Sequence, residues 1–248
     1  MLCRTVSLGL CVIVVGALSA AQQNAAPLLD KMAKSYASAT ALRVRSTIVV
    51  EQQLGDAKAK QTVRHDAVFQ RPNRLRVRWM ENQQGGLSVT CDGKTMFTQV
   101  DALRQVKKET APKTLQAVVR GDRKQLPAVD ALSCFLGEGW RAKVQTAKVV
   151  GSETVGGRSV TRIALTLKDG VQQTLWLDKD GRIWRSRRVI RRAHPGGGTM
   201  TVTVDETFQE MTLNPRLSAS DFRYTLPKGY QQVAEFQAPQ QSPPTPRQ

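Results

Sequence analysis

Few side chains in this sequence stand in a pattern known from catalysis. The chain has no Gly-x-Ser-x-Gly, phosphate-loop or His-Glu-x-x-His motif. Its two histidines are His65, within a strand pattern, and His194, in a glycine-rich loop, which favours a strand-surface position for His65 and a loop position for His194 over catalytic roles. Asp178 and Asp180 have the spacing of a calcium loop, but Asp180-Gly181 is already explained as a turn and a third ligand is missing. We therefore expect no metal site, no cofactor and no enzymatic activity, although a pair of catalytic carboxylates brought together by the fold stays open.

The cysteines favour a disulfide over a metal site. Of the four cysteines, Cys3 and Cys11 lie in the leader described next, which leaves Cys91 and Cys134. Neither of these has a Cys or His partner at ligand spacing. In an oxidising compartment a bridge between them would stabilise the fold by roughly 3 to 4 kcal/mol in the chain-entropy model. Two separately buried thiols are the alternative.

The first residues have the pattern of a secretory signal. A short basic start, Met1 to Arg4, precedes an apolar stretch from Val6 to Leu18 and small residues from Ser19 to Ala21. The apolar stretch is shorter than the roughly 20 residues that a transmembrane helix needs. We predict a cleaved signal peptide over residues 1–21 and a mature protein that works in the periplasm.

The chain is strongly basic, with 37 Lys and Arg against 20 Asp and Glu and a formal net charge of +17. Such a field favours anionic partners. Because export argues against nucleic acid, we expect an anionic membrane surface or envelope protein as the counterpart. The simpler alternative is that the basic residues only keep the outer faces of strands solvated.

Beyond the leader, the apolar pattern changes from helical to strand spacing. Asn24 to Ala41 carries apolar residues three and four apart, which predicts one amphipathic helix. From Leu42 to Val50, and again from Leu75 to Trp79, apolar residues alternate with polar or basic ones. We predict that both segments are strands with one apolar face and one solvated face.

Turn residues predict how the strands are connected. Asp-Gly pairs at 92–93, 169–170 and 180–181 each separate two alternating segments, as tight hairpin turns do. The pattern predicts about ten strands in an antiparallel meander. Beyond the two strands above, it places strands at 87–91, 95–100, 160–167, 171–177, 182–192, 199–211 and 222–225. Residues 110–142 predict one or two short helices, and the Pro- and Gln-rich residues 237–248 predict a disordered tail.

Four segments of the chain resemble a known family. Arg71 to Val77, with Arg-Pro before a strand, is similar to a strand start in the outer-membrane lipoprotein carrier (LolA-like) superfamily, which includes uncharacterised periplasmic relatives. Asp92 to Lys94, Leu175 to Ile183 and Asn214 to Gly229 are similar, in order, to its next hairpin, its Leu-Trp hairpin and its closing segment.

The resemblance implies an α+β, mainly β fold over residues 22–236. This fold is a highly curved antiparallel sheet, an unclosed half-barrel, with the N-terminal helix and the helical insertion covering its concave face. It also implies a periplasmic carrier or chaperone that holds the acyl chains of lipid or lipoprotein in that concavity, and we expect a monomer.

The alternation assigns side chains to the two faces of this sheet. The side chains expected on the concave face, either against acyl chains or in a filled core, are Leu42, Val44, Ile48, Leu75, Val77, Trp79, Leu87, Val89, Leu175, Leu177, Val202 and Val204. Leu132, Phe135 and Leu136 of the helical insertion are expected to face the same cavity from the lid. Those expected on a basic outer face are Arg74, Arg76, Arg78, Arg185, Arg187 and Arg188. The alternative function is an envelope scaffold or sensor that binds an anionic partner through this outer face.

Overall fold

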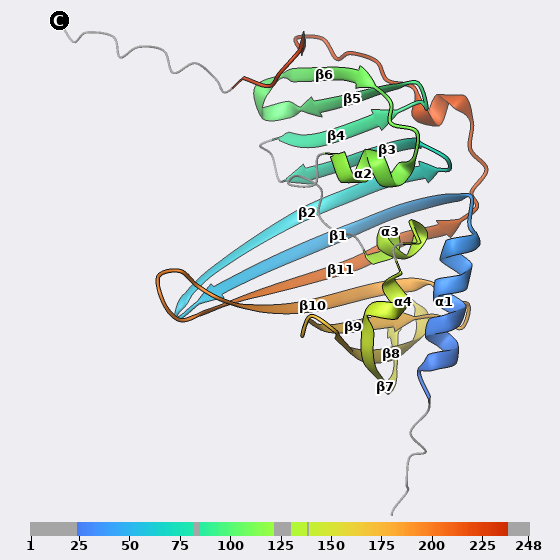
Figure 1. Ribbon diagram of the computed structural model, residues 1–248, viewed down its shortest axis with the longest axis vertical. Helices are drawn as coiled ribbons and strands as arrows, with labels where there is room; N and C mark the ends of the chain where they lie inside the picture. Colours follow the sequence, from blue (N-terminus) through green and yellow to red (C-terminus); the bar gives the residue numbers. More distant parts are fainter. Residues whose placement is uncertain (1–23, 82–84, 122–129, 138, 238–248) are drawn as a thin grey trace, which may run out of the picture.

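The computed structural model describes residues 24–81, 85–121, 130–137 and 139–237, and the following account concerns these residues (Figure 1). The predicted signal peptide lies outside them, and of the predicted tail only Gln237 lies within them. The helices are α1 (Ala26–Ser38), α2 (Leu115–Gly121), α3 (Asp130–Phe135) and α4 (Trp140–Lys143). The strands are β1 (Ala41–Leu54), β2 (Ala57–Gln70), β3 (Arg74–Glu81), β4 (Gly85–Cys91), β5 (Thr95–Val100), β6 (Gln105–Thr110), β7 (Val144–Val155), β8 (Arg158–Leu167), β9 (Gln172–Leu177), β10 (Ile183–Ala193), β11 (Thr199–Leu213) and β12 (Gln231–Val233).

The described strands form one open sheet of twelve strands, in the order β12-β6-β5-β4-β3-β2-β1-β11-β10-β9-β8-β7. Neighbours run antiparallel except β12, which lies parallel to β6. The pairing of β1 with β11 joins a first meander, β1 to β6, to a second, β7 to β11, and the helices lie on one face of the sheet (Figure 1). The predicted mainly β, unclosed half-barrel is confirmed, with twelve strands where about ten were expected.

The strand predicted at residues 222–225 is wrong. The Asp221 carboxylate accepts hydrogen bonds from the backbone N–H of Ser218 (2.7 Å) and from its hydroxyl (3.0 Å). This capping box turns Ala219–Phe222 into a short 3-10 helix and buries Phe222. The last strand is instead β12, in which Gln231 to Val233 pairs with the start of β6.

Helix α1 packs its apolar side against the sheet. Leu29, Met32 and Tyr36 are buried on that side, at the three- and four-residue spacing seen in the sequence. The Tyr36 hydroxyl accepts a hydrogen bond from the backbone N–H of Ile183, the first residue of β10 (3.1 Å). The predicted amphipathic helix is therefore present, somewhat shorter than expected.

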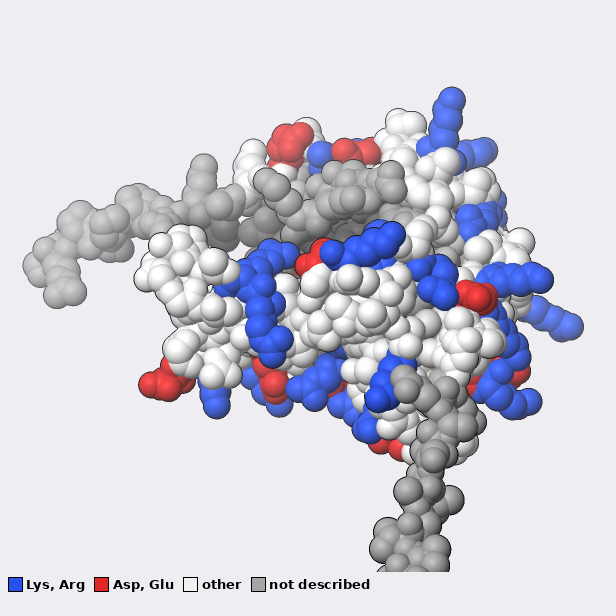
Figure 2. All heavy atoms as spheres, turned by 60° about the horizontal axis from the view of Figure 1, so that its bottom comes forward, with Lys and Arg blue, Asp and Glu red and all other residues white. Residues whose placement is uncertain are grey.

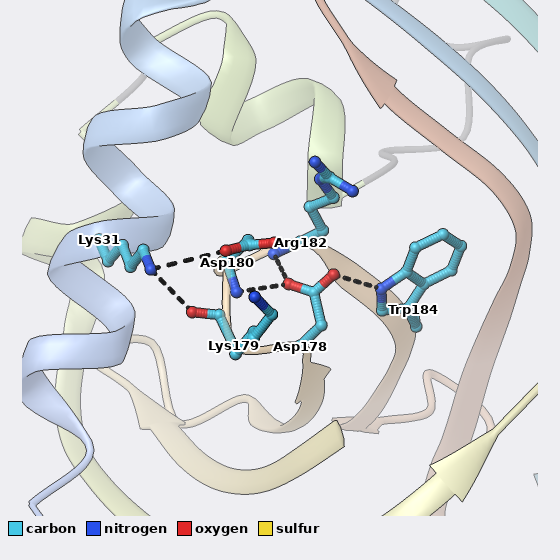
Figure 3. Close-up of polar contacts among 6 residues, drawn as sticks. All are labelled: Lys31, Asp178, Lys179, Asp180, Arg182 and Trp184. Carbon is cyan, nitrogen blue, oxygen red and sulfur yellow. Dashed lines mark hydrogen bonds and ion pairs between the residues drawn. The ribbon is translucent and has the colours of Figure 1, made fainter. Parts of the chain in front are cut away.

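The turn between β9 and β10 forms the docking point for α1. Figure 3 shows Lys31 of α1 donating to the carbonyl of Lys179 in this turn (2.8 Å). The Asp178 carboxylate holds the turn closed by accepting from the backbone N–H groups of Asp180 and Arg182, each at 2.9 Å. Gly181 has φ +80°, and a Cβ there would lie 3.0 Å from the backbone of Met32. The predicted Asp-Gly turn thus brings the chain into direct contact with α1.

The helical insertion contains three short helices where one or two were predicted. Their buried side chains join the same core as α1; in α3 and just after it these include Leu132, Phe135 and Leu136. Arg71, just after β2, ties the helices together, because its guanidinium donates to the carbonyls of Ala39 and Phe135 and lies 4.8 Å from the Phe135 ring centroid. The end of α1 and the end of α3 are thereby fixed to one corner of the sheet.

The two cysteines of the described chain are not bridged. Cys91 and Cys134 are both buried free thiols. The Cys91 thiol donates to the carbonyl of Asn73 (3.0 Å), and burial raises the pKa of the Cys134 thiol to about 12. The structure therefore has two separately buried thiols in place of the disulfide considered from the sequence.

Candidate functional site

The concave face of the sheet brings the predicted inner side chains together. Most of them are buried in one hydrophobic cluster with α1, α3 and α4, while Leu87 and Val204 pack at its margin and Val202 is half-buried on the same strand. The buried members are Leu42, Val44, Ile48, Leu75, Val77, Trp79, Val89, Leu132, Phe135, Leu136, Leu175 and Leu177. Under the helices this face is a filled core.

Part of the concave face extends beyond the helices. In Figure 1 the ends of β1, β2, β10 and β11 farthest from α1 project past the helical layer. In the last five residues of β1, the first six of β11 and the last four of β10, Val50 pairs with Val204, and Val202 pairs with Ile190. All four side chains are half-buried. We call these four residues the apolar strip.

A row of polar side chains crosses the concave face beside the filled core. It begins at Trp79 on β3 and crosses β2, β1, β11 and β10 to Gln173 on β9. Strand pairing places each member on the concave side, next to a member on an adjacent strand. We call this row the polar band; it consists of Trp79, His65, Ser46, Glu206, Ser186, Arg188 and Gln173.

The centre of the polar band is a hydrogen-bonded group of three side chains. Ser46 Oγ donates to Glu206 Oε1 (2.7 Å) and lies 3.3 Å from His65 Nδ1. His65 Nδ1 lies 3.9 Å from Glu206 Oε1, and the His65 ring stacks on Trp79 with centroids 5.5 Å apart. His65 is 1% exposed and Glu206 is 4% exposed, so this group is shielded from water.

Burial changes the protonation of this group. It raises the pKa of the Glu206 carboxyl to about 7, against the opposing effects of the Ser46 hydrogen bond and of the Arg188 charge. It lowers the pKa of the His65 imidazole to about 4. At neutral pH the histidine is neutral, and the carboxyl is present in both its protonated and its ionised form. Burying polar groups costs free energy unless they are hydrogen-bonded, and buried groups with shifted pKa values often mark functional sites. The polar band is therefore a candidate site.

Two predictions for these residues need correction. Arg188 does not belong to the outer face, because it pairs with Val204 and shares the concave side with Ser186. Adjacent residues of a strand point to opposite faces, so Arg187 and Arg188 cannot both face outward. His65 is in a strand as predicted, but it is buried among polar partners rather than on the surface of the strand. The sequence did indicate the position of Glu206, because residues two apart on a strand share a face and Glu206 follows Val202 and Val204 at this spacing.

The remaining predicted arginines lie on the convex face. Arg185 is held there by an ion pair with Asp205 (2.7 Å), and Arg187 is exposed on the same strand. Arg76 and Arg78 line a groove of about 480 Å³ together with Arg223 and Tyr224 from the segment after the 3-10 helix. Asp66 also lines this groove, but none of the three arginines forms an ion pair with a carboxylate of the described residues.

Arg74 is exposed next to this groove on β3. Figure 2 shows Lys and Arg side chains spread over the visible face, with few Asp and Glu between them. The convex groove is a local cluster of cations on a chain with a formal net charge of +17.

The described residues contain neither a metal-binding cluster nor a helix that could span a membrane. No group of three or more His, Cys, Asp or Glu side chains is arranged there to hold a metal ion. None of the helices in that part of the chain has the length and apolar character needed to cross a bilayer.

A family model matches residues 25–235 of the chain. The chain belongs to the DUF2092 family. The description of this family is "predicted periplasmic protein". The match covers the whole described sheet and its helices, so the features above belong to the DUF2092 domain.

Several solved structures are similar to this DUF2092 protein in fold. An uncharacterized conserved protein from Thermus thermophilus has 15% identity and a TM-score of 0.43, with 85% of this chain and 99% of that chain covered. Lipoprotein LppX from Mycobacterium tuberculosis has 13% identity and a TM-score of 0.40, with 79% and 100% covered. LolA superfamily protein NE2245 from Nitrosomonas europaea has 11% identity and a TM-score of 0.33, with 82% and 98% covered. No curated protein matches the sequence.

Proposed function

We propose that this DUF2092 protein is exported by its signal peptide and binds the acyl chains of a lipid or lipoprotein in the periplasm, without catalysis. The observation that carries the proposal is the apolar strip. Val50 and Val204 pack against the margin of the core, and with Ile190 and Val202 they continue the apolar concave face along the strands as half-buried side chains. Covering such an apolar sheet face with an acyl chain stabilises the complex by about 25 cal/mol for each Å² of apolar surface removed from water.

Native mass spectrometry of the protein purified from an exporting host, followed by organic extraction, tests the proposal. We expect acyl lipid in near-stoichiometric amount. A protein that stays free of ligand even after lipid is offered would contradict it.

A pair of adjacent valines provides a matched test of the face. Val50 lies in the apolar strip, whereas its neighbour Val49 lies on the convex face, and both are half-buried. Val50→Glu should lower the bound lipid at least about tenfold, because it places a charge where the chain would lie. Val49→Glu carries the same charge on the same strand and should keep the lipid. Equal loss in both variants, or in neither, would remove the concave face from the proposal.

A second candidate is an envelope scaffold or sensor, and the convex groove favours it. Arg76, Arg78 and Arg223 line it together with one carboxylate, Asp66, and none of the three forms an ion pair with a carboxylate of the described residues, which leaves an excess of positive charge for an anionic group of a membrane or protein. This function needs no ligand on the concave face, and the two candidates therefore respond to different substitutions.

A further inference from the structure

Two ring nitrogens of the polar band are buried without a hydrogen-bond partner among the described residues. They are Nε2 of His65 and Nε1 of Trp79. The two residues are directly paired across β2 and β3, and their rings stack with centroids 5.5 Å apart and an angle of 21° between the planes. Buried polar atoms in native proteins almost always have a hydrogen-bond partner. Two buried atoms on neighbouring rings that lack one therefore suggest that a bound ligand supplies it.

The hydrogen bonds of Ser46 define what His65 can offer. The Ser46 hydroxyl has one hydrogen and donates it to Glu206 Oε1. When Glu206 is ionised and accepts from Ser46, the contact between Ser46 Oγ and His65 Nδ1 requires the proton to be on Nδ1. In this ionised state His65 Nε2 is an acceptor, whereas the indole N–H of Trp79 is a donor whatever the state of Glu206. The two unpartnered atoms therefore form an adjacent donor and acceptor.

We propose that Trp79 and His65 bind the uncharged polar linkage of an acylated ligand. The Trp79 N–H would donate to the carbonyl of an acyl ester or amide, and His65 Nε2 would accept from a hydroxyl or N–H next to that carbonyl. This inference rests on the proposed function and names the part of the ligand that the polar band recognises.

The position of the pair agrees with such a ligand. On the side of His65 that faces the apolar strip, the next concave residues are Val63 and Ile48, followed by Val50, so a linkage held at His65 leaves its chain free to run over Ile48 to Val50 and Val204. An uncharged linkage fits better than a charged head group, because both nitrogens are shielded from water and the rings carry no charge at neutral pH. Since both atoms are closed off in the structure, the ligand reaches them only when this part of the face opens.

The experiment compares two ligands that differ in the carbonyl alone. Monodecanoylglycerol has an ester carbonyl, and 1-O-decylglycerol has the same chain and head group joined by an ether, which accepts hydrogen bonds poorly. Their affinities for the full-length protein are measured by titration after removal of bound lipid. We expect the wild type to bind the ester about tenfold more tightly, which corresponds to one hydrogen bond of about 1.4 kcal/mol.

The variant Trp79→Phe keeps the aromatic ring and removes the N–H. In this variant the ratio of the two affinities should fall close to one. Trp140→Phe is the matched control, because Trp140 Nε1 is also buried without a partner but belongs to α4 and not to the sheet. This control should keep the tenfold ratio.

The outcomes separate the inference from the proposed function. If the wild type binds both ligands with nearly equal affinity, the inference is overturned while acyl-chain binding stays in place. This outcome is decided by the wild type alone, without any variant. A tenfold ratio that survives Trp79→Phe also overturns it. Failure of both ligands to bind would contradict the proposed function itself, and the inference with it.

The same titration distinguishes two sources of the linkage. An N-decanoyl dipeptide amide represents the acylated end of a lipoprotein, and monodecanoylglycerol represents a glycerolipid. Both provide a carbonyl and an adjacent donor, so both should depend on Trp79. The tighter of the two identifies the source.

Discussion

At the residue scale, Glu206 makes the stability of the protein depend on pH. Its pKa is about 7 in the folded chain against 4.5 for the free side chain. A raised pKa means that the stabilising form is the protonated one, so this contribution is complete below pH 4.5 and is lost as the pH rises to about 7. Glu206→Gln keeps a neutral side chain at every pH. We expect the variant to gain stability over the wild type between these values, by about 3 kcal/mol at most.

Urea unfolding across this pH range measures the difference in free energy of unfolding. His65 changes stability in the opposite direction, since its lowered pKa makes the neutral form the stabilising one. Comparing variant and wild type at each pH largely cancels the His65 contribution. Glu210→Gln, on the convex side of the same strand where Glu210 pairs with Arg45, is the control. If the difference for Glu206→Gln does not grow with pH, Glu206 is already ionised in the folded protein.

The residue scale also shows what the sequence could and could not predict. Alternation within one strand was enough to place Leu75, Val77 and Trp79 on a common buried face. It could not show that Ser46 meets Glu206, because that contact depends on the pairing of β1 with β11, two strands far apart in the chain. Arg188 was assigned to the wrong face although alternation alone excludes it, because its neighbour Arg187 faces outward on the same strand.

At the scale of elements, the close approach of the β9–β10 turn to α1 predicts an unusual sensitivity at Gly181. Gly181→Ala would place a methyl group 3.0 Å from the Met32 backbone at a positive φ. Placing alanine at this positive φ alone lowers the free energy of unfolding by about 1 to 2 kcal/mol. We expect a larger loss in the free energy of unfolding, about 3 kcal/mol, together with faster hydrogen exchange in α1.

Gly170→Ala separates the two causes. Gly170 has the same φ of +80° in a similar Asp-Gly turn, but nothing lies within 4 Å of a Cβ placed there. In this control the free energy of unfolding should fall only by the about 1 to 2 kcal/mol that the positive φ costs. Equal losses for the two variants, with α1 exchange unchanged in both, would mean that α1 does not depend on this contact.

Turn chemistry explains why these connections were predictable and the closing segment was not. Asp92-Gly93, Asp169-Gly170 and Asp180-Gly181 all place glycine at positive φ, as the sequence pattern requires. Phe222 to Thr225 also has a strand-like composition, but the Asp221 carboxylate caps the preceding backbone and the segment pairs with no strand. Local composition therefore predicted the hairpins and failed where a side chain redirected the chain.

At the scale of the whole molecule, the net charge of +17 predicts attraction to anionic surfaces, concentrated at the convex groove. Arg76→Glu combined with Arg78→Glu should weaken binding to phosphatidylglycerol vesicles at least about tenfold in a co-sedimentation assay at low salt. Acyl-lipid content should stay at the wild-type level, because both arginines lie on the face opposite the apolar strip.

Lys148→Glu combined with Lys168→Glu is the matched control, since both lysines are exposed and the change in net charge is the same. If this control weakens vesicle binding as much as the arginine variant, attraction comes from the total charge and the groove has no special part. That result would favour the simpler explanation that the basic residues solvate the outer faces of the strands.

The pairing of β1 with β11 also sets an order of events during synthesis. β1 pairs with β2 as soon as both have been made, but its other edge stays open until Thr199–Leu213 exists. An open strand edge is a template for pairing with another chain. Contacts between distant segments also form slowly. The newly made first meander is thus the stage at which this protein is most exposed to aggregation, and a chaperone that covers one edge of β1 would protect it until the second meander arrives.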